Sequence, residues 1–308
     1  MSAILSTENL TFSYGKQTKI HGLALNIPEG SCFGLLGQNG AGKSTVIKLL
    51  LGLLKAQQGN VLLFGETLTK ENTNIFKKVG ALIEDPPLYP YLTAEVNLRI
   101  SALYHNVSAN CVMPTLDKVG LASNAKQKVS TLSTGMKQRL GIALAILHDP
   151  QLLILDEPVN GLDPEGIVMV RKLIQKLHRE EGKTIMLSSH LLNEVELSCD
   201  HVGILHQGKL LYQGSLDALH QEKYVRQQIL VETDEPEKAY NIIQASFETV
   251  VNNGMLNVHI QSKADIPKLI DTLRRQEINI FQVKVKEMRL EDLYLHFTQA
   301  ENTIHEKV

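Results

Sequence analysis

A nine-residue segment near the N-terminus combines three glycines with a lysine and two hydroxyl side chains. Its residues are Gly37, Gln38, Asn39, Gly40, Ala41, Gly42, Lys43, Ser44 and Thr45, which fit the pattern G-x-x-x-x-G-K-S/T. Glycines in this pattern let backbone N–H groups close around phosphate oxygens. Lys43 can reach the β- and γ-phosphates of a nucleotide, and the hydroxyl of Ser44 can bind Mg²⁺. The segment therefore predicts a site for a nucleoside triphosphate and its magnesium ion.

A loop of this kind needs a strand before it and a helix after it. Ser31–Leu36 is an apolar run typical of a buried strand, and Lys43–Leu54 predicts a helix that begins inside the motif. A helix N-terminus carries exposed N–H groups and the positive end of the helix dipole, and both favour a phosphate. The alternative, a glycine-rich turn that fits the pattern by chance, would not require these two flanking elements.

Two carboxylates follow a second apolar strand. The run Leu152–Leu155 predicts a strand buried on both faces of a parallel sheet, and Asp156 and Glu157 stand at its C-terminal end. Ligands of open α/β sheets bind at that end of the strands. Asp156 is the candidate magnesium ligand, and Glu157 is the candidate that polarises an attacking water. Alone, such a pair is more typical of solvated surface charge, but its combination with the phosphate loop favours the catalytic interpretation.

The length of 308 residues suggests two domains. Across residues 141–215, strands alternate with helices, which predicts βαβ units and a mostly parallel sheet. Residues 83–140, which begin with a cluster of prolines, predict a helical subdomain within a first domain that spans residues 1–215. Residues 216–308 have the order strand-helix-strand-strand-helix-strand of a small ferredoxin-like domain.

The second domain has two further local predictions. Asn252–Gly254 is a hairpin signal between two of its strands. Leu290–Phe297 has the apolar spacing of a last helix, and the residues after it read as a polar tail.

Composition excludes several classes of protein. The net charge is −2, from 31 Lys and Arg against 33 Asp and Glu, so the chain has no basic field that would hold nucleic acid. The mean hydropathy is −0.07, and no run of about 18 apolar residues predicts a membrane span. The N-terminal residues do not read as a signal peptide. Three widely spaced cysteines favour free thiols in a reducing cytosol.

Further segments resemble the motifs of a known protein family. Leu132–Leu140 resembles the signature sequence of ATP-binding cassette (ABC) proteins and precedes the Asp-Glu strand, as it does in that family. Pro158–Pro164 resembles the family's D-loop, with Asp163 in the matching place. His190 is similar to the switch histidine, and Tyr14 to the aromatic residue that stacks on adenine. The resemblance covers residues 1–215 in family order and implies an α/β P-loop NTPase core with antiparallel β and helical subdomains, followed here by a small α+β domain.

The resemblance also implies roles for these residues. The helix that begins at Ser133 and Gly135 would face the ATP of a second subunit, so that two ATP join a homodimer, with Asp163 nearby. Glu157, His190 and Lys43 would be the catalytic residues, and the cofactors would be ATP and Mg²⁺. Simpler interpretations stay open for single residues. Ser133 is also a plausible helix cap, Tyr14 can serve packing, and a lone histidine at a strand end is usually structural.

One position departs from the family pattern. The family usually places a glutamine after the strand that enters the helical subdomain, and Glu84 stands there in this chain. A carboxylate can still bind Mg²⁺ or water through oxygen, but it adds negative charge beside phosphate. The segment that follows Glu84, together with Asn160–Ile167, resembles the ATPases of bacitracin-resistance and lantibiotic-immunity exporters. The total length is closest to the bacitracin type.

These observations predict the ATP-hydrolysing subunit of an ABC exporter for peptide-antibiotic resistance or immunity. It would bind separate membrane permease subunits through the region Glu84–Tyr91 at the cytoplasmic face of the membrane, and no nucleic acid. One alternative is an ABC-2-type exporter ATPase for another drug or a lipid. A soluble ABC ATPase of translation or DNA repair is disfavoured by the single phosphate loop and the lack of a long coiled coil. A cassette that binds ATP without turnover is disfavoured by the presence of Lys43, Asp156, Glu157 and His190.

Overall fold

The computed structural model of the chain describes residues 2–221, 227–252, 254–260, 262, 264–286 and 290–305. The chain divides into two compact units, Met1–Leu216 and Asp217–Val308. Each unit has its own core. None of the described helices combines the length with the apolar composition that a membrane span requires.

A six-stranded sheet forms the centre of the first unit. Its order is β11-β10-β4-β9-β8-β7, in which all neighbours are parallel except the hairpin pair β10 and β11. The strands are β4 (Cys32–Leu36), β7 (Val79–Leu82), β8 (Leu152–Asp156), β9 (Thr184–Ser189), β10 (His201–His206) and β11 (Lys209–Ser215). Strands β4, β8 and β9 are buried along their whole length, as their apolar runs predict.

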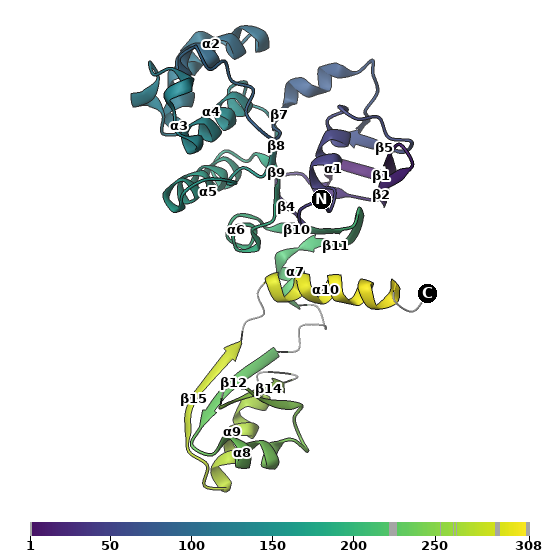
Figure 1. Cartoon of the computed structure of the whole chain (residues 1–308), viewed down its shortest axis with the longest axis vertical. Coiled ribbons are helices and arrows are strands. Elements are labelled where there is room, and N and C mark those ends of the chain that lie inside the picture. Colours follow the sequence, from purple (N-terminus) through teal and green to yellow (C-terminus); the bar gives the residue numbers. More distant parts are fainter. Residues whose placement is uncertain are drawn as a thin grey trace. The chain divides into compact units, whose positions relative to one another are not determined.

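A second, antiparallel sheet lies beside the first. It consists of β1 (Ala3–Tyr14), β2 (Gln17–Leu23), β3 (Asn26–Pro28), β5 (Gln58–Leu63) and β6 (Glu66–Thr67). Helix α1 (Lys43–Leu50) lies on the same side of the parallel sheet as this antiparallel sheet (Figure 1). One apolar core unites residues of both sheets and of α1, including Leu5, Phe33, Ile47 and Met186. This core fixes the start of α1 against the ends of the parallel strands.

Helix α1 is shorter than the sequence predicts. It ends at Leu50 instead of Leu54, and Gly52 has a φ of +69°. The amide of Gly52 donates to the carbonyl of Leu49, and a turn then leads into Leu53, which is exposed. The apolar run continues past the helix end, which is why periodicity alone overestimated its length.

The opposite side of the parallel sheet carries α5 (Pro164–Arg179) and α6 (Leu192–Ser198) (Figure 1). Helix α5 is strongly amphipathic, and Val170, Leu173 and Leu177 are buried on one face. Pro164 fits the first turn of this helix, because the backbone N–H that proline lacks would have no partner within the helix there. Helix α6 begins two residues later than the sequence predicts, because Ser189 instead forms a turn with Leu191.

Between β7 and β8 the chain is mostly helical. This stretch contains α2 (Ala94–His105), α3 (Val112–Lys118) and α4 (Thr134–Ile146), which continues past the predicted boundary at residue 140, with 3₁₀ turns at Ala109–Cys111, Ala122–Asn124 and Val129–Thr131. A further 3₁₀ segment, Thr73–Lys78, precedes β7. Helix α2 starts at a Thr93 cap and ends at Asn106, which has a left-handed conformation.

The second unit is a four-stranded antiparallel sheet packed against two helices. Its strands β12 (Gln227–Thr233), β13 (Thr249–Asn252), β14 (Met255–Ile260) and β15 (Ile280–Lys286) have the order β13-β14-β12-β15. Helices α8 (Pro236–Ile243) and α9 (Asp265–Arg275) complete the predicted ferredoxin-like order of elements. Alternating residues such as Ile229, Val231 and Val258 form the core with Leu269.

The ends of the second unit differ from the predictions. Helix α10 (Leu290–His305) continues through residues that the sequence analysis assigned to a polar tail. Helix α7 (Leu216–Gln221) covers the first half of the predicted helical linker, and the rest of that linker lies outside the described residues. Asn253, in the middle of the predicted hairpin turn, also lies outside them.

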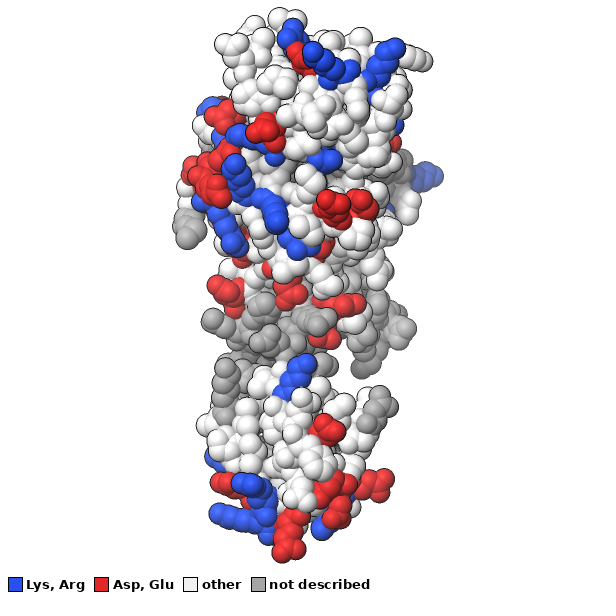
Figure 2. Space-filling model, turned by 90° about the vertical axis from the view of Figure 1, so that its left-hand side faces the viewer, with Lys and Arg blue, Asp and Glu red and all other residues white. Residues whose placement is uncertain are grey.

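On the face shown in Figure 2, lysine and arginine are interspersed with aspartate and glutamate.

Candidate nucleotide-hydrolysis site

Glycines shape the backbone of the phosphate loop between β4 and α1. Gly40 and Gly42 have φ values of +84° and +111°, a conformation that glycine adopts without steric cost. A Cβ on Gly37 would lie 2.6 Å from the carbonyl oxygen of Leu205, so no side chain fits there. At Gly40, no described atom lies within 4 Å of the position that a Cβ would take. The loop therefore leaves its backbone open for the close approach of a ligand.

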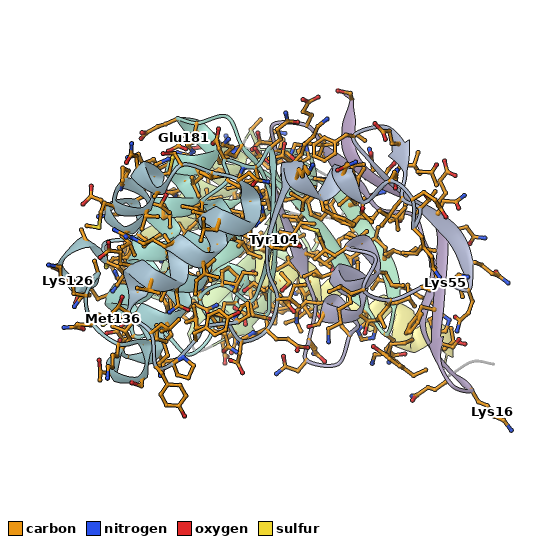
Figure 3. The ribbon with its side chains drawn as sticks, turned by 90° about the horizontal axis from the view of Figure 1, so that it is seen from above. Lys16, Lys55, Tyr104, Lys126, Met136 and Glu181 are labelled. Carbon is orange, nitrogen blue, oxygen red and sulfur yellow. The ribbon has the colours of Figure 1, made fainter. Side chains whose placement is uncertain are left out.

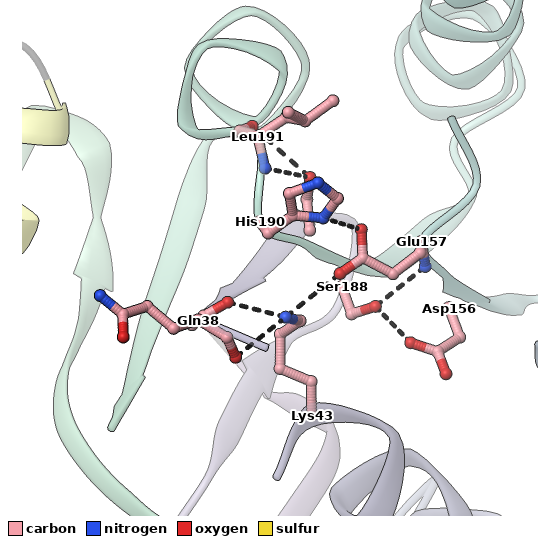
Figure 4. A network of polar contacts seen from close by, with 9 residues as sticks. Gln38, Lys43, Asp156, Glu157, Ser188, His190 and Leu191 are labelled. Carbon is pink, nitrogen blue, oxygen red and sulfur yellow. Dashed lines mark hydrogen bonds and ion pairs between the residues drawn. The ribbon is translucent and has the colours of Figure 1, made fainter. Parts of the chain in front are cut away.

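Lys43 connects this loop to the catalytic candidates. Its ammonium donates a hydrogen bond to the carbonyl of Gly37 at 2.7 Å and forms an ion pair with Oε1 of Glu157 at 3.1 Å (Figure 4). The residue is only 6% exposed. A buried ammonium needs such partners because burying an unpaired charge is costly. The loop and the end of β8 are thus held together by a charge that a phosphate can also engage.

His190 completes this chain of contacts. Its Nδ1 lies 2.8 Å from Oε2 of Glu157, so the two oxygens of that carboxylate contact different residues (Figure 4). The histidine follows β9, and the parallel strands β8 and β9 bring their C-terminal ends to the same edge of the sheet. The structure therefore places Lys43, Glu157 and His190 in one network. Their catalytic roles remain predictions.

Ser188 belongs to the same site, although no sequence motif pointed to it. The register of β8 and β9 pairs Asp156 with Ser188. The serine hydroxyl donates to Oδ1 of Asp156 at 2.5 Å and accepts from the amide of Glu157 at 2.9 Å (Figure 4). Glu157 has a positive φ of 48°, which is uncommon for a residue with a side chain. One buried hydroxyl thus holds both carboxylate residues in place.

Replacement of Ser188 tests this role. Ser188→Ala removes both hydrogen bonds, and we expect ATP turnover to fall about tenfold because a lost hydrogen bond to a charged group costs about 1.5 kcal/mol. The Mg²⁺ concentration needed for half-maximal turnover should rise. Ser188→Thr retains the hydroxyl and should be close to wild type. Ser189→Ala is the matched control, because Ser189 is also buried and, within the described residues, its hydroxyl bonds to the backbone of Leu191 rather than to a carboxylate of the site. Equal rates for the two alanine variants would contradict the proposed role.

The residues of the signature segment and the D-loop form a second group. Ser133 is the N-cap of α4, as the sequence predicts, and its Oγ accepts from the amide of Met136 at 3.2 Å. Asp163 caps α5 through the amide of Gly166 at 3.0 Å. A Cβ on Gly135 would lie 3.4 Å from the side chain of Leu162, so the two helix starts are neighbours.

This second group is separate from the phosphate loop. Among the described residues, no hydrogen bond or ion pair joins Ser133 or Asp163 to the loop. The N-terminus of a helix such as α4 favours an anion.

Tyr14 lies at the end of β1. Tyr14 is 51% exposed. Its ring packs edge-to-face with the ring of Phe12, and the two ring centroids are 4.8 Å apart. One face of an exposed ring can stack on a base. The adenine role of Tyr14 remains a prediction.

Glu84 follows β7 and has a φ of 54°. Its Oε1 lies 2.7 Å from the ammonium of Lys48, and this hydrogen bond raises the pKa of Lys48 above its ordinary value. Glu84 is thus joined to α1.

The donor set fits Mg²⁺. The ion prefers oxygen ligands, and Ser44 supplies a hydroxyl from the first turn of α1 while Asp156 supplies a carboxylate that is 3% exposed. Glu84 adds a further carboxylate. When bound, the ion would neutralise charge on the nucleotide phosphates.

The phosphate loop follows β4, and Asp156 and Glu157 lie at the C-terminal end of β8 in the same parallel sheet. Such an arrangement is a feature of P-loop nucleotide hydrolases. The family model for the ABC transporter matches residues 20–160. The chain is 40% identical over 302 residues to the bacitracin transport ATP-binding protein BcrA of Bacillus licheniformis, with 96% of this chain and 97% of the relative covered. It is 42% identical over 230 residues to the lantibiotic transport ATP-binding protein SrtF of Streptococcus pyogenes, with 74% and 99% covered. The chain belongs to the ABC transporter family as an ATP-binding subunit.

A solved structure supports the same conclusion. It is a dimeric ATP-binding cassette in a post-hydrolysis state, bound to ADP and Pi. The match has a TM-score of 0.63 and 25% identity, and it covers 69% of this chain and 98% of the other. The predicted fold class is confirmed, and the chain is an ATPase.

Proposed function

We propose that this chain is the ATPase subunit of an exporter that protects its cell from peptide antibiotics of the bacitracin or lantibiotic class. The similarity to the bacitracin transport protein carries the proposal, because it extends over 96% of the chain and so includes the second unit. The lantibiotic relative matches over only 74% of the chain. A bacitracin-like cargo is therefore the first choice.

In this proposal, two copies bind two ATP molecules at a shared interface. The phosphate loop of one copy holds the triphosphate, and the start of α4 in the other copy, with Ser133 and Gly135, meets its far side. The separation of these two groups within one chain supports the arrangement, as does the dimeric state of the solved cassette. Asp163 lies beside the start of α4 and would help to complete the interface.

Hydrolysis would use the network around Glu157. The carboxylate accepts hydrogen bonds, so it can orient a water for in-line attack on the γ-phosphate. Lys43 and His190 contact its two oxygens and hold it in position. Lys43 and the amides of the α4 start would stabilise the negative charge that develops on the phosphate. Return of the phosphate products to solvent would then let the dimer open.

The membrane permease would contact the helical region. Several large apolar side chains are exposed there, and Tyr91 and Tyr104 are 84% and 83% exposed. Tyr104 is on α2 and is labelled in Figure 3. Ile100 and Tyr104 are four residues apart on α2 and therefore share a face, and contiguous exposed apolar side chains mark interaction surfaces. The segment Glu84–Tyr91 would therefore transmit movement to separate permease subunits, with the chain peripheral to the cytoplasmic face of the membrane.

Antibiotic susceptibility of the native host tests the proposed function. The host would carry Glu157→Gln in place of the wild-type gene, and Glu165→Gln, an exposed change on α5, would be the control. We expect sensitisation to bacitracin or to a lantibiotic with the first variant only. An unchanged susceptibility across a panel of cell-envelope peptide antibiotics, with ATPase activity lost, would reject this cargo class and favour another drug or lipid cargo.

A further inference from the structure

The partner of Glu84 lies on the helix that follows the phosphate loop. Lys48 is four residues after Ser44 on α1, so both side chains project from the same face of that helix. Its ammonium lies 2.7 Å from Oε1 of Glu84. Within the described structure, Oε2 of Glu84 has no hydrogen-bond partner. The pair therefore joins the magnesium-binding face of α1 to the segment that enters the helical region.

The charges around the site indicate a function for the ion pair of Lys48 and Glu84. Asp156, Glu157 and Glu84 are three carboxylates near the place of a highly charged triphosphate. Lys43 is paired with Glu157, and the hydroxyl of Ser188 donates to Asp156. Lys48 is the ammonium that pairs with Glu84. Without Lys48, the carboxylate of Glu84 would repel the phosphates and would be free to turn away.

A role in stability is a weak explanation for this contact. The side chain of Glu84 is 61% exposed and that of Lys48 is 30% exposed. Exposed ion pairs contribute little to folding because water screens them and because two long side chains lose freedom. The position of the pair beside the magnesium donors indicates a role in nucleotide chemistry instead.

We propose that Lys48 is a positioning residue for Glu84. It neutralises the carboxylate and holds Oε1, so that Oε2 can face Mg²⁺ or a water bound to it. The requirement for Lys48 thus depends on a carboxylate at position 84. This inference rests on the magnesium site assigned above and is independent of the cargo.

A double-mutant cycle tests the dependence. The variants are Lys48→Met, Glu84→Gln and the two combined, with Lys48→Arg as the conservative replacement. Lys118→Met is the matched control, since Lys118 forms an exposed ion pair with Glu181 at 2.8 Å. ATP affinity is measured with a fluorescent ATP analogue, with Mg²⁺ and with a chelator, and phosphate release gives kcat and KM.

We expect Lys48→Met to weaken nucleotide binding about five- to tenfold, because an unpaired carboxylate then faces the phosphates. The loss should be larger with the chelator than with Mg²⁺, and kcat should also fall. Glu84→Gln supplies the second background of the cycle, because the glutamine removes the charge that needs a partner, and in that background Lys48→Met should cause no further loss. The double variant should match Glu84→Gln, and Lys48→Arg and Lys118→Met should match wild type.

Two results would overturn the inference. If Lys48→Met weakens binding equally with Glu84 and with glutamine at position 84, Lys48 acts directly on the nucleotide. If Lys48→Met has no effect on affinity or kcat, the pair is only a surface contact. Failure of the exporter proposal would look different, because wild-type Mg²⁺-dependent binding and turnover would remain while host susceptibility stayed unchanged.

Discussion

Glu157→Gln should lower ATP turnover about 10²- to 10⁴-fold, the range expected when a positioned general base is lost. A glutamine has nearly the same shape, but its amide cannot accept a proton from the attacking water. ATP affinity should change little, because Lys43 still reaches the phosphates. Phosphate release under saturating Mg-ATP measures the rate, and nucleotide titration measures the affinity.

The control for this prediction is Glu165→Gln. Glu165 is an exposed carboxylate in the first turn of α5, so its loss removes the same charge away from the network. Turnover of Glu157→Gln within a few-fold of this control would contradict the role of Glu157. His190, which contacts the same carboxylate, would then be the next candidate to orient the water.

Lys43→Ala should weaken ATP binding about 10- to 100-fold, because hydrogen bonds from a charged donor contribute about 1.5–3 kcal/mol. The change removes the ammonium that joins Gly37 to Glu157. It also leaves Glu157 without its cation, so turnover should fall further than affinity. Isothermal titration with ATP and Mg²⁺ measures the binding.

Lys55→Ala is the control for the loss of a lysine in the same region, because Lys55 is exposed beyond the end of α1. A circular dichroism melt of each variant separates weakened binding from loss of the fold. Unchanged ATP affinity in Lys43→Ala, with the fold intact, would refute the phosphate-binding role of the loop.

Local patterns predicted much of the first unit. The apolar runs placed β4, β8 and β9 correctly because strands buried on both faces need continuous apolar sequence. The Ser133 cap followed from a hydroxyl residue ahead of a helical run. Helix ends were less predictable. The apolar run past Leu50 is not helical, while α10 continues through polar residues.

Contacts between distant residues could not be predicted from one sequence. Ser188 meets Asp156 because of the register between two parallel strands, and no local pattern states that register. Lys48 and Glu84 are 36 residues apart and meet only after β7 and α1 are in place. A polar residue at the end of an otherwise apolar strand, as in Thr184–Ser189, was the available signal for Ser188.

In the second unit, the strands could be predicted from the sequence but a function could not. Alternating apolar residues predicted its strands, and Met255–Ile260 agrees at both ends. Nothing in its sequence specifies a catalytic role. The match to the bacitracin relative extends over this unit as well as the first.

The mass of Glu157→Gln in solution shows whether two chains share a nucleotide interface. Light scattering coupled to size exclusion would be run with and without saturating Mg-ATP, alongside the double variant that also carries Ser133→Arg. We predict twice the 34.2 kDa of one chain for Glu157→Gln with Mg-ATP, and the mass of one chain both without nucleotide and in the double variant. A single-chain mass for Glu157→Gln at saturating Mg-ATP, with nucleotide bound, would rule out the shared interface.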